Sequence, residues 1–329
     1  MQIGERIAAV ARDRNNSMLL ERIARFQSIT NKLGGKEGGA LVTNVAVDRV
    51  LQSRLADTVN IYLHACLSSF FSSHHFELGK DLLSWHYDFI SALPNITPNG
   101  LILVKEPVSI EFTLVHRALV NLLEPMHFFD SISAIQFPIN IRLVDGRPDP
   151  IKDARPRASN KIHCDAWAGD PSNSFTLQVP VLGDIDRTGV KFWEVTDVRQ
   201  ETCAILPKYE DGMHLIGYGE ELDLKMEFGS ATIWDSFALH ATQKTGMPRV
   251  SVEFRFSDGS RISSDFDPPG GKGRVFLDAQ QWRTVGRDMI VLSKAPLALY
   301  EKDQTHATDF SHGEVSLINI LTPPDLQVG

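Results

Sequence analysis

Long apolar runs are missing from this chain. No stretch approaches the roughly 20 apolar residues that a membrane-spanning helix needs. The N-terminal sequence MQIGERIAAVARDRNN places charges among its apolar residues and lacks the apolar centre of a signal peptide. We therefore expect a protein that neither crosses nor enters a membrane.

Cysteine and positive charge are also scarce. The chain has three cysteines, Cys66, Cys164 and Cys203, an odd and scattered set that does not predict a disulfide framework and fits a reducing, cytoplasmic setting. Lysine and arginine total 33 against 41 acidic residues, giving a net charge of −8. A nucleic-acid surface needs clustered positive charge, so the composition argues against DNA or RNA as a partner.

What is present is enough for a full globular core. The 329 residues are 43% hydrophobic and 22% charged, close to the norm for soluble domains. Residues 1–130 read as a helical support region, since apolar residues recur there at helical spacing. The helices are expected within residues 18–29, 47–71, 80–93 and 112–123.

The pattern changes near Ser131. From there to residue 257, short runs rich in β-branched and aromatic residues alternate with Gly, Pro, Asp and Asn, which predicts strands joined by short turns. Eight short strands of this kind imply an antiparallel sandwich or barrel. The expected strands cover residues 132–144, 160–167, 175–182, 190–196, 222–228, 231–234, 238–242 and 250–256.

Two further segments frame this core. Residues 197–221 form a long insertion between strands, and insertions of this length in compact domains often serve as lids over a binding site. Residues 258–329 form a C-terminal extension that we expect to pack on the core; it contains the linker-like sequence Pro268-Pro269-Gly270-Gly271.

His163 and Asp165 form the pattern His-x-Asp inside a predicted strand. Residues two apart on a strand point to the same side, so both side chains are expected to face inward while Cys164 faces away. Two imidazoles and one carboxylate on one face of a metal leave open positions, the arrangement of non-haem Fe(II) oxygenases. His-x-Asp is a weak signal alone, and the chain has a second copy at His86 and Asp88. That copy lies in a helical pattern and is interpreted as a chance occurrence, like the adjacent loop histidines His74 and His75.

The second histidine is expected at His240. It ends a run that starts at Gly229 and contains two short predicted strands. Arg249 follows nine residues later and opens the next strand, with Ser251 on the same face. An arginine there can bind a carboxylate with two parallel hydrogen bonds, which suits the distal carboxylate of 2-oxoglutarate.

The set His163, Asp165, His240, Arg249 and Ser251 resembles the Fe(II)/2-oxoglutarate-dependent dioxygenases, in a phytanoyl-CoA-hydroxylase-like or related small-molecule branch. The resemblance covers residues 131–257. It implies a double-stranded β-helix (jelly roll) core within a mainly β protein with a helical flank. It also implies Fe(II) as cofactor, with 2-oxoglutarate and O2 as co-substrates, and no catalytic residue beyond the metal site.

Some assignments stay open at this point. Arg255 lies on the same strand face as Arg249, at an offset that other branches of the family use, so either arginine can be the 2-oxoglutarate ligand. Thr176 is expected to contact the co-substrate, although it can equally be a polar residue at the edge of the core. The intact carboxylate at Asp165 argues against the halogenase branch, which has a small residue there.

Four residues are candidates for substrate binding. Arg142 lies on an early strand and either binds substrate or forms a structural ion pair. Trp167 and Trp193 either line the cavity or belong to the core. Tyr209 lies in the insertion, whose polar and aromatic mixture suits a lid over a hydrogen-bonding ligand.

The predicted function is therefore hydroxylation, or a related C–H oxidation, of a small-molecule metabolite or natural-product intermediate, coupled to decarboxylation of 2-oxoglutarate. The protein is expected to be a monomer or homodimer. Two alternatives remain. One is a non-catalytic β-helix module that binds iron or a ligand. The other is a cupin-type metalloenzyme that does not use 2-oxoglutarate, although cupins favour a His-x-His cluster that this sequence lacks.

Overall fold

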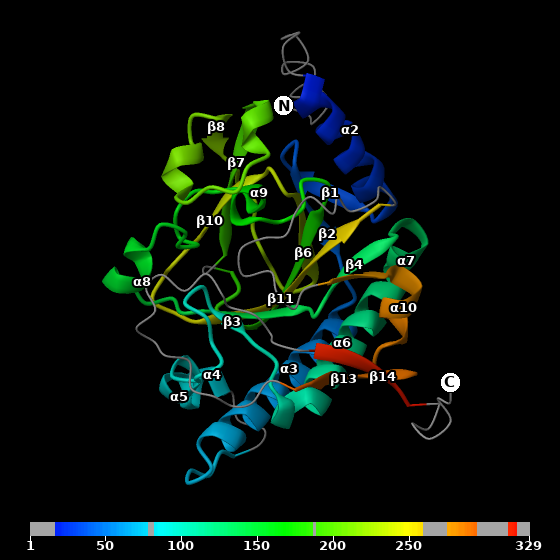
Figure 1. Cartoon of the computed structure of the whole chain (residues 1–329), viewed down its shortest axis with the longest axis vertical. Coiled ribbons are helices and arrows are strands. Elements are labelled where there is room, and N and C mark those ends of the chain that lie inside the picture. Colours follow the sequence, from blue (N-terminus) through cyan, green and yellow to red (C-terminus); the bar gives the residue numbers. More distant parts are fainter. Residues whose placement is uncertain (1–16, 78–81, 187–188, 259–274, 295–314, 321–329) are drawn as a thin grey trace.

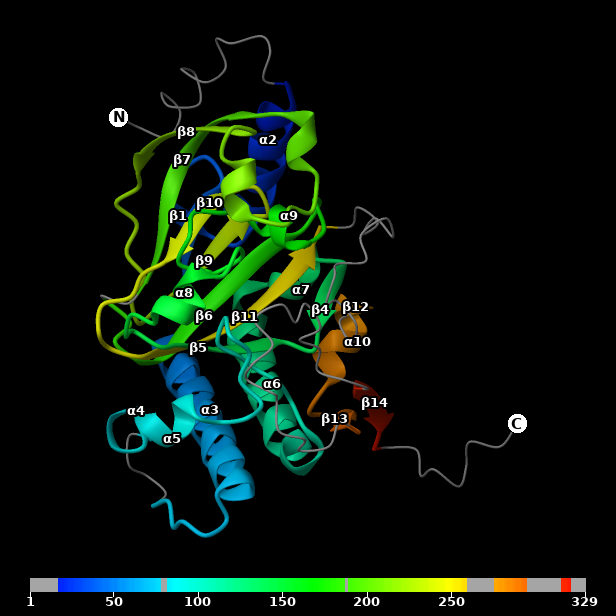
Figure 2. The same ribbon diagram turned by 60° about the vertical axis from the view of Figure 1, so that its left-hand side comes forward.

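A computed structural model describes residues 17–77, 82–186, 189–258, 275–294 and 315–320 (Figure 1). The sequence Pro268-Pro269-Gly270-Gly271 lies outside these described residues. Two facing β-sheets form the centre, and helices cover one side of the larger sheet (Figure 2). The expected mainly β core with a helical flank is confirmed. No described helix has the length and apolar character needed to cross a membrane.

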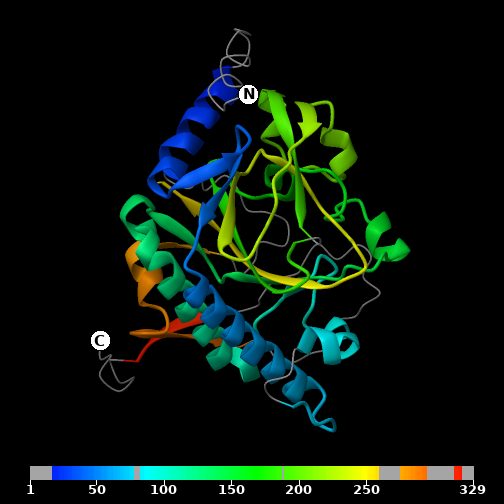
Figure 3. The same cartoon turned by 180° about the vertical axis from the view of Figure 1, so that it is seen from behind.

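Three long helices make up most of the helical flank. They are α2 (Ser17–Lys32), α3 (Arg49–Phe70) and α6 (Ser109–Leu123). Helix α3 starts at Asp48, whose side chain accepts hydrogen bonds from the backbone N–H groups of Val50 and Leu51, the usual N-cap arrangement. Helices α3 and α6 lie side by side against the larger sheet (Figure 3). The remaining helices are short: α4 (Leu82–Trp85), α5 (Tyr87–Ser91), α7 (Phe128–Ser131), α8 (Pro150–Ala154), α9 (Asp165–Ala168) and α10 (Ala279–Thr284).

The larger sheet is antiparallel throughout. Its strands, in order, are β1 (Gly35–Gly38), β2 (Val42–Ala46), β9 (Ser230–Asp235), β6 (Phe175–Gly183), β11 (Arg249–Ser257), β4 (Ala134–Phe137) and β12 (Val275–Asp278). Two more strands join it, β5 (Asn140–Val144) beside β11 and β3 (Leu101–Ile102) beside β5. The long strand β11 therefore lies at the centre of the sheet.

The smaller sheet has the order β10 (Leu239–Thr242), β7 (Val190–Val198) and β8 (Ile216–Glu221). An isolated bridge between His163 and His240 adds the segment before α9 to the free edge of β10. A separate hairpin of β13 (Met289–Ser293) and β14 (Val315–Asn319) packs near α6.

Two apolar clusters hold these layers together. One lies between the larger sheet and helices α3 and α6, and includes Phe112, Phe254 and Trp282. The other lies around the smaller sheet and α2, and includes Phe192 and Trp234. Both clusters are apolar, so a group of buried polar side chains between the two sheets is an exception that needs an explanation.

Several sequence predictions are corrected. The strand expected at 160–167 does not form: only the bridge at His163 pairs, and a helix begins at Asp165. The strand expected at 222–228 is displaced to Ile216–Glu221. The strand expected at 132–144 is split into β4 and β5 around the cis peptide before Pro138.

The boundaries of the flanking regions also differ from expectation. The helix expected at 80–93 is two short helices, α4 and α5. The N-terminal region is not purely helical, because β2 pairs with β9 along five residues. The insertion at 197–221 is partly sheet: its ends belong to β7 and β8, and only residues 199–215 leave the sheet.

Candidate metal centre

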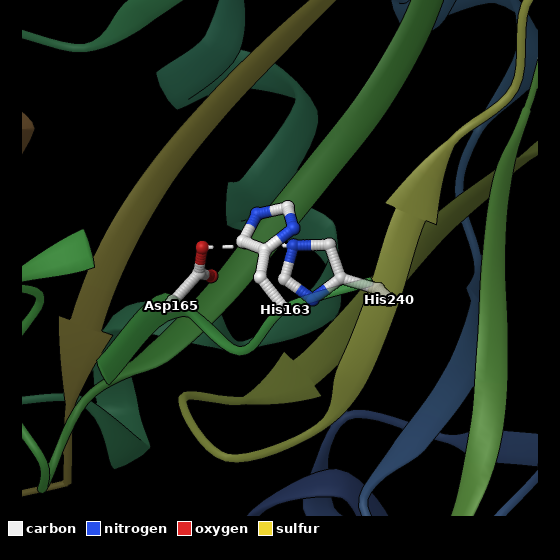
Figure 4. Close-up of side chains that lie close together, drawn as sticks. All are labelled: His163, Asp165 and His240. Atoms are coloured by element: carbon white, nitrogen blue, oxygen red, sulfur yellow. Dashed lines mark ion pairs between the residues drawn. The ribbon is translucent and has the colours of Figure 1, made fainter. Parts of the chain in front are cut away.

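Three polar side chains converge between the two sheets (Figure 4). One ligand atom from each of His163, Asp165 and His240 lies within 4.8 Å of the others, and Nε2 of His240 is 3.6 Å from Oδ1 of Asp165. The three residues are only 5–6% exposed. This group can hold a metal ion, as the sequence predicted.

The backbone places these residues by a route that the sequence did not predict. His163 and His240 exchange two backbone hydrogen bonds, with N···O distances of 3.0 and 2.8 Å. Cys164 is extended and is followed directly by helix α9, which begins at Asp165. The prediction that a continuous strand aligns His163 and Asp165 is therefore wrong, although a single extended residue gives a similar result. Cys164 is fully buried in the apolar cluster of the smaller sheet, as expected, and burial raises the pKa of its thiol.

Both imidazoles present the same nitrogen to the centre. Nδ1 of His163 donates to the carbonyl oxygen of Lys161 at 2.8 Å, and Nδ1 of His240 donates to that of Ala238 at 3.0 Å. These bonds fix the tautomer and leave each Nε2 with a free lone pair. Burial, with the neighbouring His240, lowers the pKa of His163 to about 3, so its ring is neutral and able to bind a metal at neutral pH.

The two oxygens of Asp165 have different partners. Oδ2 accepts hydrogen bonds from Thr176 Oγ1 and Trp234 Nε1, both at 2.9 Å. Oδ1 lies toward His240 and accepts one longer hydrogen bond, from Arg255 at 3.3 Å. Burial alone would raise the pKa of Asp165, but Arg255 and the two histidines hold it well below its ordinary value. The carboxylate is therefore ionised, and one oxygen remains available for a metal.

Thr176 thus has a different place from the one predicted. Its hydroxyl donates to Asp165, so the structure gives it a role in orienting a ligand side chain rather than a direct co-substrate contact. Sequence analysis missed Trp234. Its only signal was its position six residues before His240, on the strand that pairs with the Thr176 strand.

The two arginines that sequence analysis left open are distinguished by their partners. Arg255 is fully engaged: Nε donates to Asp170 at 2.6 Å, Nη1 to Glu253 at 3.1 Å and Nη2 to Asp165 at 3.3 Å. Arg249 is 0% exposed, yet only its Nη1 donates, to Gln178 Oε1 at 3.2 Å. Among the described residues, Nε and Nη2 of Arg249 have no hydrogen-bond partner.

The hydroxyl of Ser251, two residues further along β11, is also buried and has no partner among the described residues. Buried polar atoms without partners are rare and usually indicate a missing ligand or water. In arginine, Nε and Nη2 form one edge of the guanidinium, which matches the two oxygens of a carboxylate. Burial lowers the pKa of Arg249 to about 10, so the group still carries its charge.

Four residues were predicted to bind substrate. The first, Arg142, forms a structural ion pair, which was the alternative prediction for it. Its Nη2 donates to Glu253 at 2.5 Å and its Nη1 to the carbonyl oxygen of Asn99. Trp193 pairs with Leu239, so it lies on the face of the smaller sheet opposite to His240. Trp167 is 0% exposed and packs against Gly212 in the apolar cluster of the smaller sheet. The contacts of Arg142, Trp193 and Trp167 therefore do not support a role in substrate binding.

Tyr209 is the fourth, and it lies against the metal group. Its ring stacks on the imidazole of His163, with centroids 4.3 Å apart and planes 6° from parallel. Tyr209 belongs to the short 3-10 helix Tyr209–Gly212 in the excursion of residues 199–215. This excursion is tied to the ligand segment by hydrogen bonds from Tyr209 N to Pro156 O and from Leu206 N to Trp167 O, and by an ion pair between Lys161 and Glu210. It covers one side of the metal group.

The second His-x-Asp copy takes no part in this centre. His86 precedes helix α5, and the side chain of Asp88 is 87% exposed and pairs with Arg147. His74 and His75 are exposed, as expected for loop histidines.

A cleft lies at the end of the sheets near the start of β11. Its cavity volume is about 50 Å³. Thr242, which shares a strand face with His240, and Val144, which pairs with Arg249, both line it. Its other polar lining residues include Asn99, Ser159 and Asn160; the buried side-chain oxygen of Asn160 has no partner among the described residues.

No family model matches the chain, and no curated protein matches it. Among solved structures, it is similar to the non-heme alpha ketoglutarate dependent epimerase SnoN from nogalamycin biosynthesis, at 17% identity and a TM-score of 0.34, covering 74% of this chain and 84% of that one. It is also similar to AviO1 from Streptomyces viridochromogenes Tue57, at 12% identity and a TM-score of 0.41 (72% and 97% covered). A third is an N-substituted L-amino acid dioxygenase from Burkholderia ambifaria AMMD in complex with alpha-KG, at 14% identity and a TM-score of 0.31 (65% and 81%). At these identities and TM-scores, the likenesses do not define the activity of this chain.

Proposed function

We propose that the protein is a non-haem Fe(II) oxygenase that uses 2-oxoglutarate, with a double-stranded β-helix core. One observation carries the proposal: hydrogen bonds through Arg255, Glu253 and Gln178 connect a buried His-Asp-His group to the buried guanidinium of Arg249. One edge of that guanidinium has no partner among the described residues. The strand order supports the fold, because β5, β11, β6 and β9 face the 163 segment, β10, β7 and β8, all antiparallel. Two four-membered antiparallel layers of this kind form a jelly roll.

The residues of the centre fit ferrous iron. His163 and His240 offer neutral nitrogens, and Asp165 offers one anionic oxygen, which is the facial set that leaves three positions open. Structural zinc sites are closed by four protein ligands, and no fourth side chain joins this group among the described residues. When bound, iron would supply the activation of O2 that no side chain can provide.

Arg249 and Ser251 would hold the distal carboxylate of 2-oxoglutarate. The free Nε and Nη2 edge of Arg249 offers two parallel N–H groups, and Ser251 adds a hydroxyl. The charged pair forms in a site closed to water, where a hydrogen-bonded ion pair is strong. The reaction balances as substrate plus 2-oxoglutarate and O2 giving hydroxylated substrate, succinate and CO2.

The other residues keep this site oriented and dry. Thr176 and Trp234 fix Asp165, the carbonyl groups of Lys161 and Ala238 fix the two imidazoles, and Tyr209 covers His163. The proposed reaction needs no additional side chain to donate or accept a proton.

For the substrate, we propose a small polar molecule. The cleft beside Thr242 and Asn160 is lined by several polar side chains, the kind of group that orients a ligand in a small-molecule site. Its hydroxyl and amide groups suit a hydrogen-bonding ligand. The expected test is a panel of small polar metabolites assayed for stimulation of 2-oxoglutarate consumption. Thr242→Trp should abolish the stimulation by filling the cleft, and stimulation by a protein or nucleic acid alone would contradict the proposal.

Anaerobic titration with Fe(II) and 2-oxoglutarate tests the central assignment. Chelation of ferrous iron by the co-substrate gives a weak visible absorption band, which neither a module that only binds iron nor a cupin that ignores 2-oxoglutarate would show. Asp165→Asn should lose iron, while Asp88→Asn, its counterpart in the second His-x-Asp copy, should retain it. Arg249→Gln should bind iron normally and shift the 2-oxoglutarate titration by about 2–5 kcal/mol, or tens- to thousands-fold. The surface variant Arg147→Gln serves as control. Absence of the band in the native protein would refute the use of 2-oxoglutarate.

A further inference from the structure

A buried glutamate lies between the metal group and the free arginine edge. Glu253 shares the inner face of β11 with Arg249, Ser251 and Arg255, because side chains two apart on a strand point the same way. It is 3% exposed. Although burial raises its pKa, Arg142 and Arg255 lower it to about 2, so the carboxylate is ionised. Among the described residues, the group that could hold a metal ion does not include Glu253.

One oxygen of Glu253 faces the metal side. Oε1 accepts hydrogen bonds from Arg255 Nη1 at 3.1 Å, from Arg142 Nη2 at 2.5 Å and from Asn140 Nδ2 at 3.3 Å. Arg255 in turn donates to Oδ1 of Asp165 at 3.3 Å. Glu253 therefore helps to fix the arginine that touches the metal carboxylate.

The other oxygen faces the co-substrate side. Oε2 accepts from Gln178 Nε2 at 3.1 Å. Because a carboxylate can only accept, this contact forces the amide of Gln178 to present its Nε2 to Glu253 and its Oε1 to Arg249. Arg249 donates to that oxygen through Nη1, which leaves Nε and Nη2 as the free edge.

We propose that Glu253 is a positioning residue that aligns Arg249 for the co-substrate through Gln178 while holding Arg255 against the metal carboxylate. The inference rests on the proposed function, since it concerns the same site. Each hydrogen bond along the path from Glu253 through Gln178 to Arg249 has a fixed donor and a fixed acceptor. A substitution can exchange the donor and the acceptor.

Glu253→Gln is the direct test. The amide can still accept at one oxygen from Arg142 and Arg255, but its NH2 group then faces the NH2 group of Gln178. Gln178 can relieve this clash only by flipping, which turns its NH2 group against Arg249. We expect the affinity for 2-oxoglutarate, measured anaerobically from the visible band, to fall about 10- to 100-fold, as for other outer-shell substitutions. The apparent KM for 2-oxoglutarate should rise by the same factor, with kcat at saturation changed less than about twofold.

Combining Glu253→Gln with Gln178→Glu exchanges the two side chains and restores the direction of the path. The carboxylate, now at position 178, would accept from both Arg249 and the amide at position 253. The net charge is unchanged, so most of the lost affinity should return. A purely structural role for Glu253 would predict that the double variant is no better than the single one. Asp235→Asn, a buried carboxylate with an arginine partner elsewhere in the same sheet, controls for general loss of stability.

The outcomes separate the two proposals. A native protein without the band contradicts the proposed function itself. A native protein with the band, and a folded Glu253→Gln variant of equal affinity, overturns the role of Glu253. Should Glu253→Gln fail to fold, Gln178→Met keeps the ion pairs of Glu253 and removes only the link to Arg249. It should show the same loss of 2-oxoglutarate affinity with normal iron content, and native affinity in that variant would equally overturn the inference.

Discussion

Trp234 contributes its indole N–H to the oxygen of Asp165 that does not face the metal group. Together with Thr176, it leaves that carboxylate one orientation, with Oδ1 toward His240. Outer-shell donors of this kind hold a ligand in place before the metal arrives. Their contribution is therefore to affinity and geometry rather than to the chemical step.

Trp234→Phe should lower iron affinity about tenfold while preserving the apolar packing of the ring. Iron affinity can be measured by competition with a chelator. Trp282→Phe, which removes an indole hydrogen bond to the carbonyl oxygen of Gln136 in the other apolar cluster, is the control. Equal affinity in Trp234→Phe and the native protein would show that Thr176 and Arg255 are enough to orient Asp165.

A separate prediction concerns His116, which is far from the metal group in sequence and packs against Trp282. Its Nε2 donates to the carbonyl oxygen of Trp282, it is fully buried, and burial lowers its pKa from 6.5 to about 3. Because the folded-state pKa lies below the unfolded one, folding favours the neutral ring. The stability is complete above pH 6.5 and declines as the pH falls toward 3.

His116→Met should therefore reduce the pH dependence of unfolding. Between about pH 6.5 and pH 4.5, the native protein should lose about 2–3 kcal/mol more of its unfolding free energy than the variant does. Urea titrations at the two pH values measure the difference. The exposed substitution His75→Met should leave the native dependence unchanged, and equal slopes in native protein and His116→Met would assign acid sensitivity elsewhere.

Among the elements, helix α2 is held partly by a buried ion pair between Arg22 and Asp235. Nε and Nη2 of Arg22 both donate to Oδ1 of Asp235, at 2.9 and 2.6 Å, and the guanidinium lies 3.6 Å from the centre of the Phe237 ring. Asp235 is 1% exposed and also accepts from the N–H of Phe237 in the turn before β10. The helix is thereby joined to the turn that leads to His240.

Arg22→Met should cost about 3–5 kcal/mol, because it leaves a buried carboxylate without its positive partner. Adding Asp235→Asn should recover part of this loss, since the amide is neutral and still accepts from Phe237. Chemical denaturation of the two variants and the native protein measures both changes. A double variant less stable than Arg22→Met would contradict a charge-burial explanation.

The excursion of residues 199–215 places Tyr209 on His163, and this stack is its direct contact with the metal group. Tyr209→Ala should weaken iron binding about 10-fold or more, because the imidazole loses the ring that fixes its plane. Tyr209→Phe should bind iron normally. Glu210→Gln, which removes only the partly exposed ion pair with Lys161, should have little effect. Normal iron affinity in Tyr209→Ala would leave the excursion with a role toward substrate alone.

At the scale of helices and strands, the sequence predicted some features of the protein and missed others. The spacing of His163, Asp165 and His240 predicted a group that can hold a metal ion, and the structure brings these three side chains together. The role of Arg249 stays a prediction. The helix at Asp165 was not predictable from period-two reasoning, since one extended residue replaces a strand there. Nor was the pairing of β2 with β9, because no local pattern reports a partner so distant along the chain. The free edge of Arg249 depends on the orientation of Gln178, which only the packed structure reveals.

For the whole molecule, the space between the sheets is balanced in charge. Arg142, Arg249 and Arg255 provide three positive charges, and Asp165, Asp170 and Glu253 provide three negative ones, since all six groups lie in one contact network. A divalent ion adds two positive charges to this buried region, and a dicarboxylate removes them. Each ligand therefore relieves the electrostatic cost of burying the other.

This balance predicts mutual enhancement of binding. Iron should tighten 2-oxoglutarate by a factor that equals the factor by which 2-oxoglutarate tightens iron, because the coupling free energy is shared. Calorimetric titration of each ligand with and without the other, under anaerobic conditions, measures both factors. We expect at least about tenfold, the range of ordinary coupling free energies. Independent binding of the two ligands would contradict the electrostatic account.

The central position of β11 also bears on how the sheet assembles during synthesis. Residues 249–257 hydrogen-bond to β6 on one side and to β5 and β4 on the other. The edges of these earlier strands that face β11 therefore stay unpaired until β11 has left the ribosome. Contacts between distant segments close slowly, and until then the strand edges and apolar faces are exposed to aggregation. His163 and Asp165 are translated well before His240 and the arginines of β11. Under the proposed function, iron would bind only after the sheet closes, and a nascent chain arrested before residue 249 should retain no metal.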